Sequence, residues 1–499
     1  MNFTIIDVFV IIGYFGFVLY IGFIYRTKNT STSKDFFLAG KNMSWPWIML
    51  SIVATETSSL TFLSVPGMSF KSNFAFLQIV FGYIAGRAFV GYVILPMYFK
   101  GEYSTVYEWV GIRFGKSVQK AMSSIFLITR VLGDGVRLYV TSIPIALLLK
   151  AFLPDFSEHS IGIMTLLLIT IATSLYTVFG GFKSIVLTDS FQFFVYIAGG
   201  VFAFYLISNS LLNSETFTGL FSKGISDSKL KIFHFDYENL FKEPYFFLNA
   251  FFGGALISIG SHGVDQMIAQ RILACKTKEE GRLALIGSGI LVLLQFVLFL
   301  SIGFMLFYFY KNTDLIPDKV FSKYILENIP TGILGLIISA ILASAMSTLS
   351  STINSLSLSF LVDIKSTSVE SGDINVKDSR LASLFWSVLL FFSSLFPFYL
   401  SGNYQEGLLE LGLKIASFTF GPMIGLFFLG VYFSKRTKVF LHPKGILFAL
   451  FFGLISTMVF VHIWKPAFTL VIPFGIIFFY IYLIVFFVIL RSRNRKLLS

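Results

Sequence analysis

Residues 52–62 read IVATETSSLTF and lie inside an apolar stretch that begins near Trp45. A helix that crosses a lipid bilayer is expected to carry apolar side chains at this depth, because no water is present to satisfy polar groups. The segment instead carries five hydroxyls and one carboxylate, from Thr55, Glu56, Thr57, Ser58, Ser59 and Thr61. It therefore predicts a polar site inside a membrane-spanning element.

The composition of the whole chain is that of a membrane protein. Its 499 residues are 56% hydrophobic and only 13% charged, whereas ordinary soluble domains are about 45–50% apolar and about 25% charged. Apolar runs of roughly 18 or more residues, the length that crosses a bilayer, recur along the chain. The runs are continuous rather than alternating, which argues against a membrane barrel. The sequence predicts an all-α polytopic membrane protein.

We predict thirteen membrane-spanning helices and no soluble domain. An odd number of spans places the two termini on opposite sides of the membrane. The predicted spans lie near residues 4–25, 45–68, 75–99, 121–153, 160–179, 185–211, 245–270, 282–310, 330–362, 379–400, 407–432, 445–464 and 468–490.

Lysine and arginine are distributed unevenly between the two sides that these spans define. If the N-terminus is outside, the inside segments carry 24 of them and the short outside segments carry five. An excess of basic residues is usual on the cytoplasmic side. The net charge of +12 thus reflects topology and not nucleic-acid binding. We expect a multi-pass protein of the cell (plasma) membrane with its N-terminus outside and its C-terminus in the cytoplasm.

Among the charged residues within the predicted spans, nine are of particular interest. A charge at the bilayer centre costs roughly 2.5–3.5 kcal/mol even on lenient scales, so each is a candidate functional residue. These residues are Glu56, Arg87, Arg130, Asp134, Arg137, Asp189, Asp265, Glu410 and Lys414.

Three of these charges, Arg130, Asp134 and Arg137, share one helix face because they are spaced i, i+4 and i+7. One interpretation is an internal ladder of ion pairs. The other is an arginine that offers its guanidinium to a solute. The ladder is favoured for Arg137, and both interpretations stay open for Arg130.

The remaining charges are best explained by pairing. Glu56 and Arg87 lie on separate spans, and we expect Glu56 to pair with Arg87 or with Lys414 in a structural role. Glu410 and Lys414 are spaced i, i+4 and predict an ion pair of their own.

A second concentration of hydroxyls lies in ASAMSTLSSTINSLSLSF, residues 343–360. Helix packing alone explains two or three serines, because small residues let membrane helices approach closely. A dense stripe on one face, matched by the cluster at 55–61, is better explained by Na⁺, a hard cation that requires several oxygen ligands. At helical spacing the stripe contains Ser344, Ser347, Thr348, Ser351 and Ser355.

Two spans show signs of interruption. Hydroxyl side chains at 55–61 offer the backbone alternative partners, and residues 253–263 contain Gly253, Gly254, Gly260 and Gly263. These spans are the second and the seventh, and inverted-repeat transporters place broken helices at corresponding positions of two halves. We therefore predict a 5+5 inverted-repeat core.

The predicted division of the chain follows from this core. Residues 1–44 hold an extra N-terminal span and a cytoplasmic loop, and residues 45–211 form the first five-helix repeat. Residues 212–244 form an extracellular loop, and residues 245–432 form the second repeat. Residues 433–499 contain two extra C-terminal spans and a basic tail.

Four stretches, taken in order, resemble the sodium:solute symporter family, which includes the sodium–glucose cotransporters. The resemblance covers nearly the whole chain. It rests on FLAGKNMSWPWIMLSIVATETSSLTFLSVPG (37–67), YTVFGGFKSIVLTDSFQ (176–192), DQMIAQRILACKT (265–277) and LASAMSTLSSTINSLS (342–357).

The resemblance implies one Na⁺ site between the second and ninth spans. Its ligands would be the backbone carbonyls of Ala54, Thr57 and Ser344 and the hydroxyls of Ser347 and Thr348. Some members, including bacterial sialic-acid symporters, resemble this chain at a second Na⁺ site as well. The matching residues here are Asp189, Ser350 and Ser351.

The function expected from the resemblance is secondary active transport, in which inward Na⁺ flux drives uptake of a small polar solute. Ser58 and Thr61 would face the solute, and Gln78 would line its pocket. Arg130 matches in position an arginine that holds a carboxylate in sialic-acid symporters. A sugar or polyol is our first prediction for the solute and a carboxylate such as sialate is the second. The expected partners are the solute and the lipid bilayer, without an obligate protein partner.

Alternative functions remain open at this stage. A proton-coupled carrier of the same architecture would use Glu56 or Asp189 as its proton site. A membrane-embedded enzyme is disfavoured because the five histidines are scattered without metal-ligand spacing. A channel is disfavoured because no filter-like loop is evident.

Overall fold

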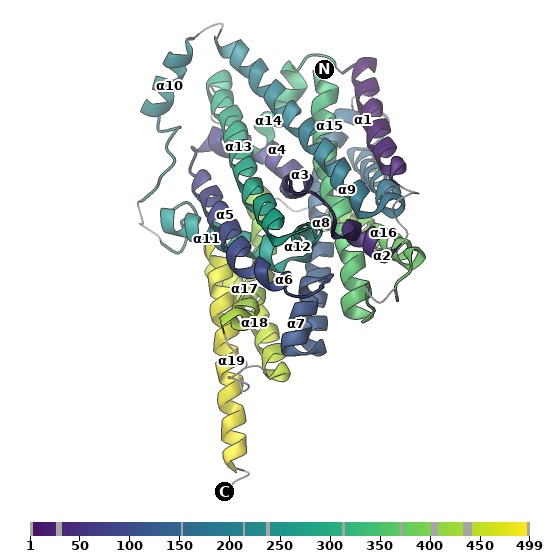
Figure 1. Cartoon of the computed structure of the whole chain (residues 1–499). Helices are drawn as coiled ribbons and strands as arrows, with labels where there is room; N and C mark the ends of the chain where they lie inside the picture. Colours follow the sequence, from purple (N-terminus) through teal and green to yellow (C-terminus); the bar gives the residue numbers. More distant parts are fainter. Residues whose placement is uncertain are drawn as a thin grey trace.

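The structure is a computed structural model that describes residues 3–25, 32–150, 153–212, 215–235, 240–311, 315–369, 373–400, 408–432 and 442–496. Its regular elements in these ranges are helices (Figure 1). The one β-bridge there is an isolated pair between Met43 and Cys275. The prediction of an all-α polytopic membrane protein is confirmed.

Nine helices in the described ranges are long and apolar enough to cross a membrane, or ten when a bent pair counts as one span. The bent pair is α3 (Trp45–Glu56) with α4 (Ser59–Lys71). The nine are α1 (Ile5–Ile24), α5 to α6 (Leu77–Tyr98), α9 (Glu158–Leu212), α11 with η3 (Phe247–Val264), α13 (Lys278–Tyr310), α15 with η4 (Ile333–Ile364), α16 (Val376–Leu400), α18 (Pro443–Trp464) and η5 with α19 (Phe468–Lys496).

The difference from thirteen has two physical sources. α9 has 55 residues, about 80 Å at the rise of an α-helix, whereas the bilayer core is about 30 Å thick. Gly181 interrupts α9 with φ 66° and ψ −168°, between the predicted spans 160–179 and 185–211. α8 (Lys116–Lys150), which carries six charged residues, and α17 (Leu408–Tyr432) fall outside the nine. Thirteen spans therefore stay a prediction, as do the repeat boundaries.

The first predicted break is confirmed. α3 ends at Glu56, Thr57 and Ser58 are extended, and α4 begins at Ser59 with a bend of 64°. Ser58 caps the new helix because its hydroxyl accepts the Thr61 backbone N–H at 3.3 Å. Serine favours this position, where a cap is worth about 1 kcal/mol.

The second predicted break was misplaced. The chain stays helical from Phe247 through the π-turn η3 (Gly260–Val264), and only Asp265 is extended before α12 (Gln266–Leu273). The glycines serve close packing instead. A Cβ on Gly254 would lie 2.3 Å from the Ile79 carbonyl oxygen on α5.

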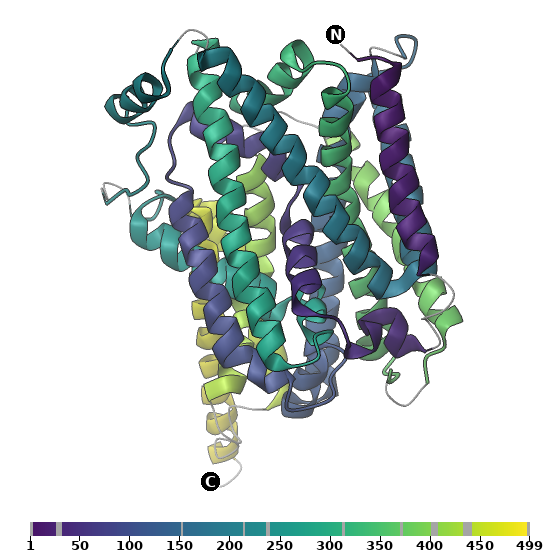
Figure 2. The ribbon, with the colours of Figure 1, turned by 45° about the horizontal axis from the view of Figure 1, so that its top comes forward.

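The broken pair α3–α4 lies in the middle of the bundle. It contacts α9, α13 and α15, and Figure 2 shows α13 on one side of it and α9 with α15 on the other. α12 and α17 also pack against it. A polar break at this position is enclosed by protein and not by lipid.

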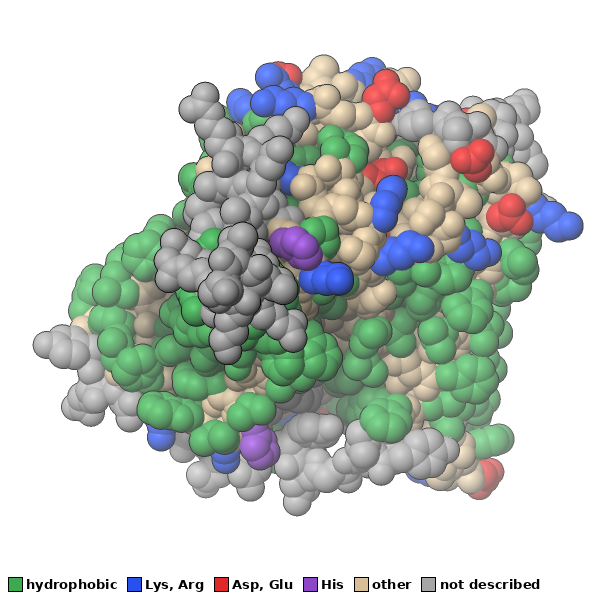
Figure 3. All heavy atoms as spheres, turned by 90° about the horizontal axis from the view of Figure 1, so that it is seen from below, with side chains coloured by type: hydrophobic (Ala, Val, Ile, Leu, Met, Phe, Trp, Pro, Cys, Tyr) green, Lys and Arg blue, Asp and Glu red, His purple; other side chains and the backbone are tan. Residues whose placement is uncertain are grey.

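The two ends of the described chain lie on opposite sides of the bundle. α1 begins at the top of Figure 1 and α19 ends at the bottom, beyond α2 (Ser33–Leu38) and α7 (Val106–Phe114). Viewed from below, lysine and arginine side chains gather over part of this lower face, with hydrophobic side chains at its rim (Figure 3). The cytoplasmic assignment of the lower face stays a prediction. Glu410, Lys414 and the loop at 433–441 lie outside the described side chains.

Candidate functional site: a polar cavity at a helix break

The end of α3 supplies free backbone carbonyls. Its helical ladder stops with the Thr57 N–H donating to the Val53 carbonyl at 2.9 Å. Because Ser58 is extended, the carbonyls from Ala54 onward are released from the ladder, as at any helix C-terminus. This end of a helix carries partial negative charge, which favours a bound cation.

α15 presents hydroxyls to the same place. The Thr348 hydroxyl donates to the Thr55 carbonyl at 3.2 Å and to the Ser344 carbonyl at 3.1 Å. Ser347 is fully buried, and its hydroxyl makes no hydrogen bond within the described part of the chain. An unpaired buried hydroxyl beside freed carbonyls suits a hard cation such as Na⁺.

The structure thus brings together the segments of the first predicted Na⁺ set. Ala54 and Thr57 lie at the end of α3, and Ser344, Ser347 and Thr348 lie on the facing part of α15; all five are buried. The Ser344 hydroxyl bonds back to the Ile341 carbonyl at 2.8 Å, so only its carbonyl is available, as the resemblance implied.

The second predicted set is also assembled, but an arginine already lies within it. Asp189 is fully buried, accepts the Ser51 hydroxyl at 2.6 Å and pairs with Arg271 Nη2 at 2.9 Å. Ser350 donates to the other Asp189 oxygen at 3.5 Å, and Arg271 also contacts the Ser351 hydroxyl. The charge of Asp189 is therefore balanced by a guanidinium of the chain itself, and these residues fit a Na⁺ poorly in this arrangement.

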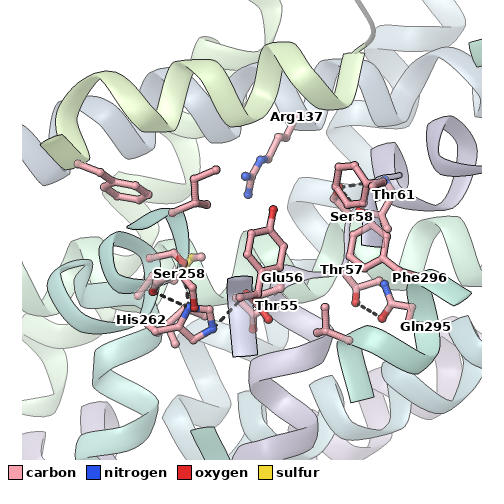
Figure 4. Close-up of a pocket in the computed structure, with 18 of the residues that line it drawn as sticks. Thr55, Glu56, Thr57, Ser58, Thr61, Arg137, Ser258, His262, Gln295 and Phe296 are labelled. Carbon is pink, nitrogen blue, oxygen red and sulfur yellow. Dashed lines mark hydrogen bonds and ion pairs between the residues drawn. The ribbon is translucent and has the colours of Figure 1, made fainter. Parts of the chain in front are cut away.

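A cavity of about 120 Å³ lies beside the break (Figure 4). A single water needs roughly 10–15 Å³, so the space fits a small solute. Ser58 and Thr61, the residues predicted to face the solute, line it together with Thr55, Glu56, Thr57, Phe76, Tyr83, Arg130, Arg137, Ile257, Ser258, Ser261, His262, Met267, Ile268, Val292, Gln295, Phe296 and Phe420.

The two arginines of α8 differ in how they are bound. Arg130 pairs with Asp265 at 2.8 Å and with Asp134 at 3.6 Å, and its side chain is 10% exposed. Arg137 has only Asp134, at 3.5 Å, among the described residues, and its side chain is 27% exposed. Figure 4 shows the Arg137 guanidinium pointing into the cavity. The ion pairs of Asp134 with both arginines form the internal ladder that was favoured for Arg137, and the Arg137 guanidinium also faces the cavity.

Glu56 has the structural partner that the sequence predicted. Its carboxylate lies 2.5 Å from Arg87 Nη2 and 3.1 Å from His262 Nε2. Arg87 is fully buried and also donates to the Ser288 hydroxyl at 2.7 Å. Glu56 thereby links α3 to α5, η3 and α13 at the wall of the cavity.

Gln78 does not reach the cavity. Its amide donates to the Tyr245 carbonyl at 2.9 Å, and its oxygen accepts the His234 N–H at 3.2 Å. It ties the start of α5 to the segment before α11. Sequence reasoning did not assign Gln295, whose Oε1 accepts the Thr57 hydroxyl at 2.9 Å in the cavity wall.

An oxygen set suited to a cation beside a polar cavity, both at a helix break, defines a carrier for an ion and a small solute. Residues 36–453 match the sodium:solute symporter family. The chain belongs to this family, as predicted; it is a multi-pass, Na⁺-coupled solute symporter and not an enzyme.

Two relatives and one solved structure are similar to this chain. It is 26% identical over 444 residues to the sodium-coupled monocarboxylate transporter 2 of Homo sapiens, covering 87% of this chain and 68% of the relative. It is 27% identical over 447 residues to the sodium/sialic acid symporter SiaT of Proteus mirabilis, covering 88% of this chain and 86% of SiaT. A substrate-bound, outward-open Na⁺-coupled sialic acid symporter has the same fold, with a TM-score of 0.81 at 22% identity over 97% and 98% of the two chains.

Proposed function

We propose that this symporter carries a small carboxylate inward together with one Na⁺. The observation that supports the carboxylate is Arg137, whose guanidinium points into the cavity with a single partner at 3.5 Å among the described residues. A planar guanidinium binds a carboxylate through two parallel, charge-assisted hydrogen bonds. A neutral sugar carries no charge with which to pair this guanidinium.

The sugar or polyol, our first prediction, finds no support among the relatives. Their names describe a monocarboxylate transporter and a sialic acid symporter. Residues 265–277, one of the four stretches that carry the family resemblance, make structural contacts. Asp265 holds Arg130, and Gln270 donates to the Phe37 carbonyl and the Asn354 side chain, both at 2.6 Å.

The remaining cavity wall would select the rest of the solute. Hydroxyls of Ser58, Thr61 and Ser261 line the cavity beside the rings of Phe76 and Phe296. Hydroxyls can donate to or accept from polar groups on the solute, while the aromatic rings suit its carbon skeleton. A short hydroxylated carboxylate matches this combination.

Na⁺ would couple to the solute through the break between α3 and α4. The first set of ligands lies at the end of α3 and on α15, and Ser58 and Thr61 follow on α4. A cation that fixes the released carbonyls would also fix the residues that begin α4 and line the cavity. The break would have one arrangement that binds Na⁺ tightly and one that binds it weakly. The gain in solute affinity can be no larger than the difference in Na⁺ binding free energy between these two arrangements.

We propose one Na⁺ and not two because Arg271 balances the charge of Asp189. A cation added there would lie against a guanidinium in a buried environment, where like charges repel strongly. Inward transport follows from an inwardly directed Na⁺ gradient across the cell membrane.

The test is binding to the purified protein, with and without Na⁺, of pyruvate, N-acetylneuraminate, glucose and a polyol. We expect only the carboxylates to raise the unfolding temperature, and only with Na⁺. Stabilisation by glucose alone would overturn the proposal. Carboxylate binding with equal affinity in K⁺ would overturn Na⁺ coupling. Uptake into proteoliposomes under a Na⁺ or a pH gradient then separates Na⁺ coupling from proton coupling.

A further inference from the structure

A groove of about 510 Å³ lies on the surface of the bundle, away from the solute cavity. It is formed by η4 (Phe360–Ile364), the π-helical end of α15, and by the first turns of α16, which pack against each other. Its wall is apolar and contains Phe360, Leu361, Leu381, Leu384, Phe385 and Val388. None of these residues lines the solute cavity.

The open side of the groove faces the lipid. Leu381 is 65% exposed, Leu384 50% and Phe385 55%, and all three belong to a helix that is long and apolar enough to cross a membrane. Exposed apolar side chains on such a helix contact acyl chains in a bilayer. The occupant of the groove therefore includes a hydrocarbon chain.

Two charges of opposite sign line the same groove. Lys365 follows the last residue of η4, and Asp378 lies in the first turn of α16. Both are at the end of a predicted membrane span, where lysine places its ammonium at the level of lipid head groups. Lys365 lies over the Phe360 ring at 5.5 Å, and within the described residues neither charge has an ion-pair partner.

We propose that this groove binds a zwitterionic phospholipid with a primary ammonium head group, of the phosphatidylethanolamine type. Lys365 would bind the phosphate, Asp378 the ammonium, and the apolar wall an acyl chain. An anionic head group without an ammonium would be repelled by Asp378. A trimethylammonium head group has no N–H to donate to its carboxylate, and hydrogen bonds between charged groups are the stronger ones.

The position of the groove gives the lipid a role in the transporter. η4 continues α15, whose Ser347 and Thr348 belong to the proposed Na⁺ set. On its inner side η4 is held by Asp363, which accepts the Thr105 hydroxyl at 2.8 Å and the Gln119 amide at 2.7 Å. A lipid on the outer side would hold the same turn against α16 and so stabilise the end of the ion-binding helix.

The experiment uses the purified, delipidated full chain in detergent. Native mass spectrometry and the unfolding temperature are measured after addition of phosphatidylethanolamine, phosphatidylcholine, phosphatidylglycerol or glycerophosphoethanolamine, which has the head group without chains. We expect the ethanolamine lipid to be retained most and to stabilise most, and the chain-free head group to have no effect. Preference for phosphatidylglycerol, or full stabilisation by glycerophosphoethanolamine, would overturn the proposal.

Three variants and two matched controls separate the contacts. Asp378→Asn should abolish the preference for ethanolamine over choline. Lys365→Gln should weaken binding of every phospholipid about tenfold, the effect of losing one charge-assisted hydrogen bond. Lys377→Gln, a neighbouring basic residue outside the groove wall, is the matched control. Val388→Trp should fill the groove and prevent retention, whereas Leu389→Trp, beside it but not in the wall, should not; equal retention by both would overturn the proposal even if the charge variants fail to fold.

Discussion

Arg130 and Asp265 form a buried ion pair in which Nη2 lies 2.8 Å from Oδ2. The pair joins the middle of α8 to the single extended residue between η3 and α12. Asp265 also caps α12, because its Oδ1 accepts the Met267 N–H at 2.9 Å. Arg130 therefore holds a helix break in place, and Arg137, two turns further along α8, is left to face the cavity.

Arg137→Gln should weaken carboxylate binding by about tenfold or more, because one charge-assisted contact is worth about 1.5–3 kcal/mol. The unfolding temperature without solute should change little, since Arg137 has a single 3.5 Å partner among the described residues. Isothermal titration with the carboxylate at saturating Na⁺ measures the change.

The comparison variant is Arg130→Gln. It should lower the free energy of unfolding by about 3–5 kcal/mol, because it leaves a buried carboxylate without its cation. If Arg137→Gln binds the carboxylate as tightly as the native protein, Arg137 is not the carboxylate ligand.

Ser347→Ala with Thr348→Ala should raise the Na⁺ concentration needed for solute binding by about tenfold, equivalent to about 1.4 kcal/mol. The two hydroxyls are lost while the carbonyls of α3 remain. The measurement is the Na⁺ dependence of solute binding by the purified protein.

Ser344→Ala is the control for the Na⁺ set. The Ser344 hydroxyl bonds to Ile341 in its own helix, and only its carbonyl is a proposed ligand, so the Na⁺ dependence should stay unchanged. An unaltered Na⁺ dependence in the double variant would contradict the assignment of Ser347 and Thr348.

Asp189→Asn should destabilise the protein by about 3–5 kcal/mol, because Arg271 is 1% exposed and would lose its counter-ion. The Na⁺ dependence of solute binding should keep the shape of a single site. Thermal unfolding and a Na⁺ titration of the same sample measure both effects. A stable variant whose Na⁺ dependence loses one cooperative step would instead make Asp189 a Na⁺ ligand and would refute the one-ion proposal.

Glu56→Gln should destabilise by a similar amount, because Arg87 is fully buried beside it. The double variant Glu56→Gln with Arg87→Gln should be more stable than the sum of the two single losses, by 0.5–3 kcal/mol, as for contacting residues. A double-mutant cycle in unfolding free energy measures this coupling. Ser288→Ala removes the hydrogen bond from Arg87 and the one that the Ser288 hydroxyl donates to the Leu285 carbonyl of its own helix, and should cost about 1 kcal/mol. Strict additivity would show that the pair contributes no coupling.

Local chemistry made part of the fold predictable. The hydroxyls of Thr57 and Ser58 bond to backbone groups within four residues along the chain, so a broken helix could be predicted from the segment itself. The pairing of Glu56 was also predictable, since a charge inside the membrane needs a partner and Arg87 was one of two candidates. The glycines of 253–263 led to a wrong position for the second break, because glycine occurs both where helices unwind and where helices pack closely. The close approach of α5 to Gly254 shows that Gly254 serves packing.

The sequence by itself determined that this is a helical membrane protein of the sodium:solute symporter family, with hydroxyls on two segments and a break at Thr57. These properties depend on composition, on periodicity and on contacts between near neighbours. Only the tertiary structure decided that Arg130 has two carboxylate partners and Arg137 one, that Arg271 balances Asp189, and that Gln78 turns away from the cavity. Each of these depends on a partner far along the chain, and helix packing alone determines which partner comes within hydrogen-bond distance.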